Sequence, residues 1–170
     1  MSLAIAPTDS SNAELVRWEV EALNRGDAGA LRQVLTSETV ERFPDRTCRG
    51  ADEIVAYFEE ALAAVPDWHM EVRAIVAERD DVLMHWHLTG THTGPLLGIA
   101  ATGKPLSIDG IDHFVLGEGK IVSNFVVFDQ MQYARQIGLM PPDGSAGDKA
   151  LKAAFNARTK LAGRIKRRSA

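Results

Sequence analysis

Apolar residues recur every three or four positions over most of the first 65 residues, which is the period of amphipathic α-helices. A first helix is predicted to begin after Ser11, because Ser11 and Glu14 have the spacing of a capping box, and to end at Gly26. Asp27 has the side chain to cap a second, short helix, and a third helix is predicted over residues 51–64.

The period of the pattern changes to two after Pro66, and β-branched and aromatic residues become frequent. Four strands are predicted, over residues 68–77, 82–93, 105–116 and 120–128. Residues 36–49 indicate an additional strand and turn. A short helix is expected between Asp129 and Gly138.

Helices followed by a run of antiparallel strands and a closing helix are typical of the α+β class. Such a chain buries its apolar positions best if a curved antiparallel sheet wraps around the N-terminal helices, and the resulting cone leaves an internal pocket. We expect this domain to span residues 11–141, after a flexible leader at 1–10. Residues 142–170 are predicted to form a linker and an amphipathic basic helix.

The composition is that of a soluble globular protein, with 45% apolar and 25% charged residues in a chain of 170. No stretch is long and apolar enough to span a membrane, and the N-terminus lacks the features of a secretory signal, so a cytoplasmic location is expected. Cys48 is the only cysteine, which excludes an internal disulfide and a thiolate metal site.

Charge is divided unevenly along the chain. Residues 1–147 carry 22 acidic and 11 basic side chains, whereas residues 148–170 carry one acidic and eight basic side chains. An acidic body repels nucleic acid, so neither nucleic acid nor a membrane is expected as a partner. The apolar stripe of the last helix favours docking on the body or on a partner subunit. Attraction to an anionic membrane or nucleic acid is the second interpretation, and disorder is the third.

One predicted hairpin brings polar residues together inside the expected pocket. A three-residue loop at 117–119 pairs Leu116 with Lys120 and Asp112 with Asn124. Because opposed residues share a face, a carboxylate and an amide then meet among apolar neighbours. Burial raises the pKa of a carboxyl group toward the range in which it exchanges protons near neutrality. We hypothesise that Asp112 is an acid/base and that Asn124 orients it; the alternative is that Asp112 caps an edge or pairs with a basic side chain.

Aromatic and apolar residues would form a pocket wall suited to a flat, apolar ligand. The predicted ligand contacts are Trp18, Trp86, Phe114, Val126, Phe128, His113 and Asp129. In the predicted register His113 faces the opposite side of the sheet, and only a β-bulge would bring it to the pocket. Asp129 begins a helix, so helix capping is its alternative role.

Three other histidines are interpreted as structural. His85 and His87 share one face of a strand and could in principle hold a metal, but no carboxylate follows at the spacing of a cupin-type site. Hydrogen bonding within the sheet is the favoured interpretation. His92 is expected to tie down its loop by a hydrogen bond to backbone. We therefore expect no metal site.

A glycine-rich stretch carries a resemblance to a known family. It contains Gly90-Thr91-His92-Thr93-Gly94, Gly98, Thr102-Gly103-Lys104 and Gly119-Lys120-Ile121, and it closes with Asp129 and Gln136-Ile137-Gly138. With these motifs the chain resembles, over residues 12–141, the SnoaL-like polyketide cyclases of the NTF2-like superfamily. The resemblance implies a cone-shaped α+β barrel, usually a homodimer, with an apolar pocket and neither a metal nor an organic cofactor.

The resemblance also implies a chemistry, and this chain departs from its pattern at two positions. Characterised members cyclise an aromatic polyketide ester by an intramolecular aldol reaction, using an aspartate on the last strand and a histidine on the preceding strand. With the hairpins aligned, these positions hold Val126 and Asp112 here. We expect a cofactor-free enzyme that performs acid/base chemistry on a small, apolar, carbonyl-bearing substrate.

Two alternatives remain open. The first is a hydrolase or isomerase of the same fold: Glu41 stands near the place of a ketosteroid-isomerase-like base. The only candidates for an epoxide-hydrolase-like set are Asp112, Arg73 and Asp129. The second is a protein that binds a small molecule without converting it, which the apolar Val126 favours.

Overall fold

A computed structural model describes residues 11–168 of the chain, with side chains through residue 162. In chain order the elements are α1 (Asn12–Asn24), the 3-10 helix η1 (Ala28–Gln33), β1 (Val40–Arg42), β2 (Thr47–Arg49), α2 (Gly50–Ala64), β3 (His69–Glu78), β4 (Asp81–Thr91), β5 (Pro105–Gly117), β6 (Lys120–Phe128), α3 (Gln130–Gln136) and α4 (Ala146–Arg168). Each predicted helix and strand has a counterpart among them. The predicted leader at residues 1–10 lies outside the described residues.

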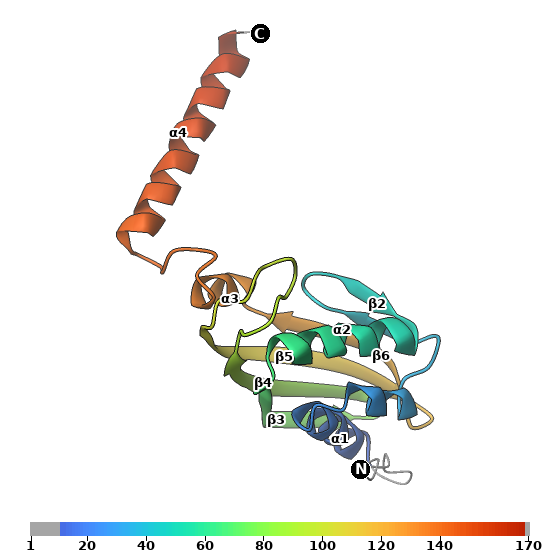
Figure 1. The fold of residues 1–170 in the computed structure, drawn as a ribbon. Coiled ribbons are helices and arrows are strands. Elements are labelled where there is room, and N and C mark those ends of the chain that lie inside the picture. The colour runs from blue at the N-terminus through green and yellow to red at the C-terminus, as the bar shows by residue number, and fades with distance from the viewer. Residues whose placement is uncertain (1–10, 169–170) are drawn as a thin grey trace.

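The helix-start signals in the sequence act as predicted. The backbone N–H of Ser11 donates to the Glu14 carboxylate at 2.8 Å, which closes the first turn of α1. The Asp27 carboxylate accepts from the N–H of Ala30 at 3.1 Å, which begins η1. Both α1 and α2 lie across one face of the sheet (Figure 1), and each helix carries a set of buried residues. This face therefore holds the core.

A six-stranded sheet forms the second layer, in the order β2-β1-β6-β5-β4-β3. The α+β class and the curved sheet are confirmed, and the sheet remains open rather than closing into a barrel. Neighbouring strands are antiparallel except for β1 and β6, which are parallel. This pairing corrects the prediction of a wholly antiparallel sheet. The two strands are far apart in sequence, so no hairpin fixes their relative direction.

The turn between β5 and β6 is tighter than predicted. It contains two residues, Glu118 and Gly119, with φ values of 51° and 70°. Two successive left-handed residues are what a type I′ hairpin turn requires. Gly117 consequently pairs with Lys120, so the predicted three-residue loop is wrong.

A β-bulge between Val115 and Leu116 shifts the β5–β6 pairing again. Asp112 lies opposite Val126 rather than Asn124, so the predicted pair is wrong by two residues. A shift of two residues keeps the same face, and Asp112 and Asn124 are both buried on the inner side of the sheet. Val122, two residues before Asn124 on β6, is exposed because it lies at the bulge.

The last helix, α4, extends away from the rest of the molecule (Figure 1). Its start is fixed by the Asp148 carboxylate, which accepts from the backbone of Gly144 at 3.1 Å and from Nζ of Lys152 at 2.7 Å. The apolar side chains of Leu151 and Phe155 are exposed, so the predicted docking of this helix on its own body is not observed. No helix among residues 11–168 has the length and apolar character to cross a membrane.

The outer face of the sheet carries an apolar cluster. Leu83, Ile111, Phe125 and Val127 lie on neighbouring strands, and each exposes about half of its surface. Contiguous exposed apolar surface of this kind marks association sites. We propose that the homodimer expected from the resemblance forms through this cluster.

The double variant Ile111→Asp/Phe125→Asp is expected to sediment as a monomer at concentrations where the unmodified chain sediments as a dimer. Two carboxylates at the centre of such an interface would be desolvated without partners. Sedimentation velocity measures the change. Leu139→Asp, at an exposed apolar residue outside the sheet, is the control and should leave the dimer intact. A dimer that survives the double substitution would exclude this face.

Candidate active site

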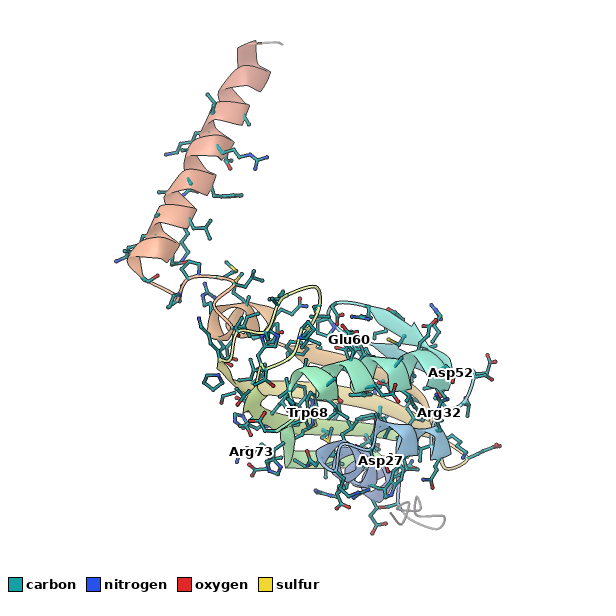
Figure 2. All side chains as sticks on the ribbon, in the orientation of Figure 1. Asp27, Arg32, Asp52, Glu60, Trp68 and Arg73 are labelled. Atoms are coloured by element: carbon teal, nitrogen blue, oxygen red, sulfur yellow. The ribbon has the colours of Figure 1, made fainter. Side chains whose placement is uncertain are left out.

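A cavity of about 110 Å³ lies between the helices and the inner face of the sheet. Helices α1, α2 and α3 and strands β3 to β6 form its wall, which is mainly apolar and aromatic. Wall residues include Val20, Leu23, Phe58, Trp68, Met84 and Leu106. Figure 2 labels Trp68, between the helical layer and the sheet, and shows Arg32 and Asp52 at the outside of the molecule near η1 and α2. The cavity occupies the place where a pocket was expected.

Asp112 brings a carboxyl group into this cavity. It lies on the inner face of β5 with 7% of its surface exposed. Nε1 of Trp86 donates to its Oδ1 at 2.8 Å, and Nδ2 of Asn124 donates to its Oδ2 at 3.3 Å. Burial raises the pKa of Asp112 to about 6, against the hydrogen bonds from Trp86 and Asn124, which lower it. The carboxyl group is held in one orientation and titrates near neutrality.

Gly110 explains how Trp86 reaches Asp112. The two residues are partners across the β4–β5 pairing. A Cβ atom at position 110 would lie 2.1 Å from Cζ2 of the Trp86 ring, so any side chain there would displace the indole. Glycine at this position therefore allows the Trp86–Asp112 hydrogen bond.

Glu19 is a second acidic residue of the cavity, and sequence analysis missed it. It lies on α1, lines the cavity and exposes 3% of its surface. Burial raises the pKa of Glu19 well above its usual value, and the carboxylates of Glu41 and Asp112 raise it further. The signal was present in the sequence, since Glu19 stands four residues after Leu15 and four before Leu23, inside the apolar stripe of the helix.

Glu41 completes the acidic group from behind the cavity wall. It is fully buried on β1, where it pairs with Asn124 of β6. Burial raises the pKa of Glu41 to about 8, and Asp112 adds to the effect, whereas the nearby Asn124 amide lowers it. Neither carboxyl oxygen of Glu41 has a hydrogen-bond partner of normal geometry. Glu19, Glu41 and Asp112 thus form a group of buried carboxyl groups, which we call the acidic cluster.

The predicted site residues divide into two groups. The cavity wall includes Trp86, Phe114, Val126 and Phe128, and Asn124 touches Asp112 without lining the wall. Trp18 is buried in the core but is not among the residues that line the cavity. His113 lies on the outer face, with Nε2 2.7 Å from the Asp81 carboxylate. Asp129 accepts two hydrogen bonds from the first turn of α3 and is its cap. These three residues are therefore not wall residues, contrary to the prediction.

The other histidines have structural partners. Nδ1 of His87 lies 2.9 Å from the Asp109 carboxylate, and its Nε2 lies 3.2 Å from the Ser107 hydroxyl. Nδ1 of His92 lies 3.1 Å from the Thr102 hydroxyl, so the ring contacts a side chain of its loop rather than the backbone group that was expected. Within residues 11–168, no group of three or more His, Cys, Asp or Glu side chains has the arrangement to bind a metal.

One buried hydroxyl group in the cavity has no partner. Tyr133 of α3 lines the cavity and exposes 9% of its surface, and its hydroxyl makes no hydrogen bond within the described chain. A buried polar group without a partner costs free energy. A ligand with an oxygen or nitrogen atom would satisfy it. The wall thus combines apolar surface with a few polar groups, as small-molecule sites do.

The model of the SnoaL-like polyketide cyclase family matches residues 13–137. The chain belongs to this family. The match covers α1 to the end of α3 and so includes the cavity and its acidic cluster, but it excludes α4. A comparison with curated proteins finds no match to this SnoaL-like chain.

Solved structures extend the comparison. AclR from Streptomyces galilaeus, a proposed hydroxylase, shares 28% identity over 87% of this chain and 89% of its own, with a TM-score of 0.65. TsrD from Streptomyces laurentii shares 26% identity over 76% of this chain and 98% of its own, with a TM-score of 0.68. A proposed SnoaL-like polyketide cyclase from Jannaschia sp. CCS1 shares 21% identity over 80% and 100%, also with a TM-score of 0.68, and supports the fold alone.

The acidic cluster should make the stability of this SnoaL-like protein fall as pH rises. A carboxyl group whose pKa is raised in the folded state keeps its proton there and loses it in the unfolded chain. For Glu41 the free energy of unfolding should therefore decrease between about pH 4.5 and about pH 8, by on the order of a few kcal/mol. Urea unfolding at pH 5, 6, 7 and 8 measures the decrease.

Glu41→Gln is the test variant, because an amide resembles the protonated acid but does not titrate. Its stability should decline less steeply with pH than that of the unmodified chain. The control is Glu59→Gln, on the exposed face of α2, which should keep the original slope. Parallel curves for the unmodified chain and Glu41→Gln would contradict the assignment.

Proposed function

We propose that this protein is an enzyme that performs cofactor-free acid/base chemistry on a small, apolar, carbonyl-bearing substrate. The supporting observation is Asp112, a carboxyl group in an apolar cavity that is oriented by Trp86 and Asn124. Such a group suits the abstraction of a proton from carbon, which needs a base with a pKa near the working pH. A polyketide-like ester or ketone is the class of substrate that the family favours.

The position of Asp112 supports a relocated base. In the family pattern the aspartate corresponds to Val126 and its histidine partner to Asp112. These two positions are directly opposed across β5 and β6, and Cα atoms of opposed residues are about 4.5–5.5 Å apart. A carboxyl group on β5 can therefore reach the same part of the cavity as one on β6. We infer that Asp112 on β5 performs the role that the aspartate on the last strand has in the family pattern.

The reaction follows from these contacts. The ionised Asp112 takes a proton from the carbon next to the substrate carbonyl, so that the C–H bond breaks and an enolate forms. Trp86 and Asn124 hold the carboxylate in place during the transfer. The enolate carbon then attacks a second carbonyl group in a cyclase, or receives a proton at another carbon in an isomerase. Removal of that first proton is common to both outcomes.

A direct test follows the exchange of carbon-bound protons in D₂O. 2-Tetralone is a flat, apolar ketone whose acidic C–H protons can be followed by NMR. The unmodified protein should accelerate exchange, with a rate that rises through about pH 6 as Asp112 ionises. Asp112→Asn should lower the rate by about 10²–10⁴-fold, the usual contribution of a positioned base.

Asp109→Asn is the matched control. Asp109 lies on the same strand but on the outer face, and its substitution should leave exchange unchanged. If 2-tetralone raises the melting temperature while exchange is the same with and without Asp112, the alternative of a non-catalytic binding protein replaces this proposal.

A further inference from the structure

Glu19 has the features of a side chain that binds a ligand. It lies on α1, across the cavity wall from the sheet that carries Asp112, and is almost completely buried. Its Oε2 has no hydrogen-bond partner. The hydroxyl of Tyr133, from a different element, is unpartnered in the same cavity. Two buried polar groups on separate helices therefore lack partners where an apolar wall surrounds them.

The charges near Glu19 are all of one sign. The titratable groups that act on it are Glu41 of β1 and Asp112 of β5, and the neutral amide of Asn124 lies on β6 between them. Within the described part of the chain, no lysine, arginine or histidine forms an ion pair with any of the three acids. Buried like charges without a counter-ion cannot all persist, so protons must neutralise part of the cluster.

The hydrogen bonds indicate which of the three acids is ionised and which two keep a proton. Asp112 accepts from two N–H donors, which favour its ionised form. The carboxyl oxygens of Glu41 and Oε2 of Glu19 accept none, so these residues are the ones that keep protons. The cavity thus presents one carboxylate, at Asp112, and one neutral acid, at Glu19. Glu41 lies behind them and has no cavity surface.

We propose that Glu19 is a second catalytic residue, which donates a hydrogen bond from its neutral carboxyl group to the carbonyl oxygen of the substrate. This inference rests on the proposed function and adds a requirement for the substrate. The substrate must present its C–H group to Asp112 and the adjoining carbonyl oxygen to Glu19 at the same time. A neutral ketone, enone or β-keto ester satisfies this geometry, and an anionic carboxylate does not because it would face Asp112.

The proton balance is complete without another reactant. When the C–H bond breaks, the proton forms an O–H bond on Asp112 and the electron pair moves onto the carbonyl oxygen. The Glu19 hydroxyl strengthens its hydrogen bond as that oxygen gains negative charge, which is how preorganised donors stabilise a transition state. Return of the proton from Asp112 to carbon restores both acids. Glu41 lies behind Glu19 and offers no positive charge that would favour ionisation of Glu19, and a negative charge on Glu41 would raise the pKa of Glu19 further.

The test measures the infrared stretch of the bound carbonyl group. A hydrogen bond from Glu19 lowers the frequency of this stretch, whereas a residue that only supports the fold leaves the frequency unchanged. 2-Tetralone labelled with ¹³C at the carbonyl is bound to Asp112→Asn, which prevents exchange, and its stretch is recorded by difference infrared spectroscopy. The stretch should lie below that of the ketone in an apolar solvent. It should stay low when Glu19→Gln is added, since an amide still donates, and it should rise when Glu19→Leu is added.

Exchange rates provide the second measurement in the otherwise unmodified chain. Glu19→Leu should lower 2-tetralone exchange by about 10²-fold, the usual effect of losing one such donor, and Glu19→Gln should recover most of the rate. Glu21→Gln, on the exposed face of the same helix, is the control and should leave the rate unchanged. Circular dichroism checks that each variant is folded.

The possible outcomes separate the two proposals. Exchange that depends on Asp112, with a carbonyl stretch that is the same in the Glu19→Leu and Glu19→Gln backgrounds, overturns the role of Glu19 and leaves the base in place. If the carbonyl stretch differs between the Glu19→Leu and Glu19→Gln backgrounds but the protein does not accelerate proton exchange, the contact between Glu19 and the carbonyl is supported and the role of Asp112 as the base is overturned. A ketone that shows no bound stretch in any background overturns both.

Discussion

The burial of three carboxyl groups without a counter-ion is the constraint on which the rest of the site depends. Glu19, Glu41 and Asp112 come from α1, β1 and β5, and only folding brings them together. Their desolvation opposes folding, so the surrounding apolar core has to offset it. Proteins seldom retain such an arrangement when apolar residues of similar size would pack as well. The acid/base function that we propose gives these carboxyl groups a use inside an apolar cavity.

The sequence predicted the elements of this fold well because each has a local signal. The capping residues Ser11 and Asp27 and the two-residue period of the strands all act between near neighbours in the chain. The register of the β5–β6 hairpin was missed because a glutamate, Glu118, adopts the left-handed conformation that a two-residue turn needs. That conformation is unusual for a residue other than glycine, so the sequence pattern favoured a longer loop.

The candidate site was predicted in part for the same reason. Asp112 and Asn124 lie on the neighbouring strands β5 and β6, whose alternation assigns both to the inner face, and an error of two residues in the pairing preserves that assignment. Glu19 could not be paired with them from the pattern alone, because its partners lie far away in sequence. His113 was set among the ligand contacts but faces outward, since the bulge at Val115 lies beyond it and leaves its face unchanged. Local periodicity assigns a face, whereas contacts between elements decide which polar groups meet.

The fixed start of α4 has an electrostatic consequence for the whole molecule. The helix extends about 35 Å from a body of opposite net charge, and the ion pair between Asp148 and Arg135 holds its first turn near the end of α3. Such a separation of charge makes the molecule a permanent electric dipole. The field of this dipole reaches about 10 Å at 0.1 M salt and about 30 Å at 0.01 M salt. Ionic strength therefore sets how far from the molecule its separation of charge acts.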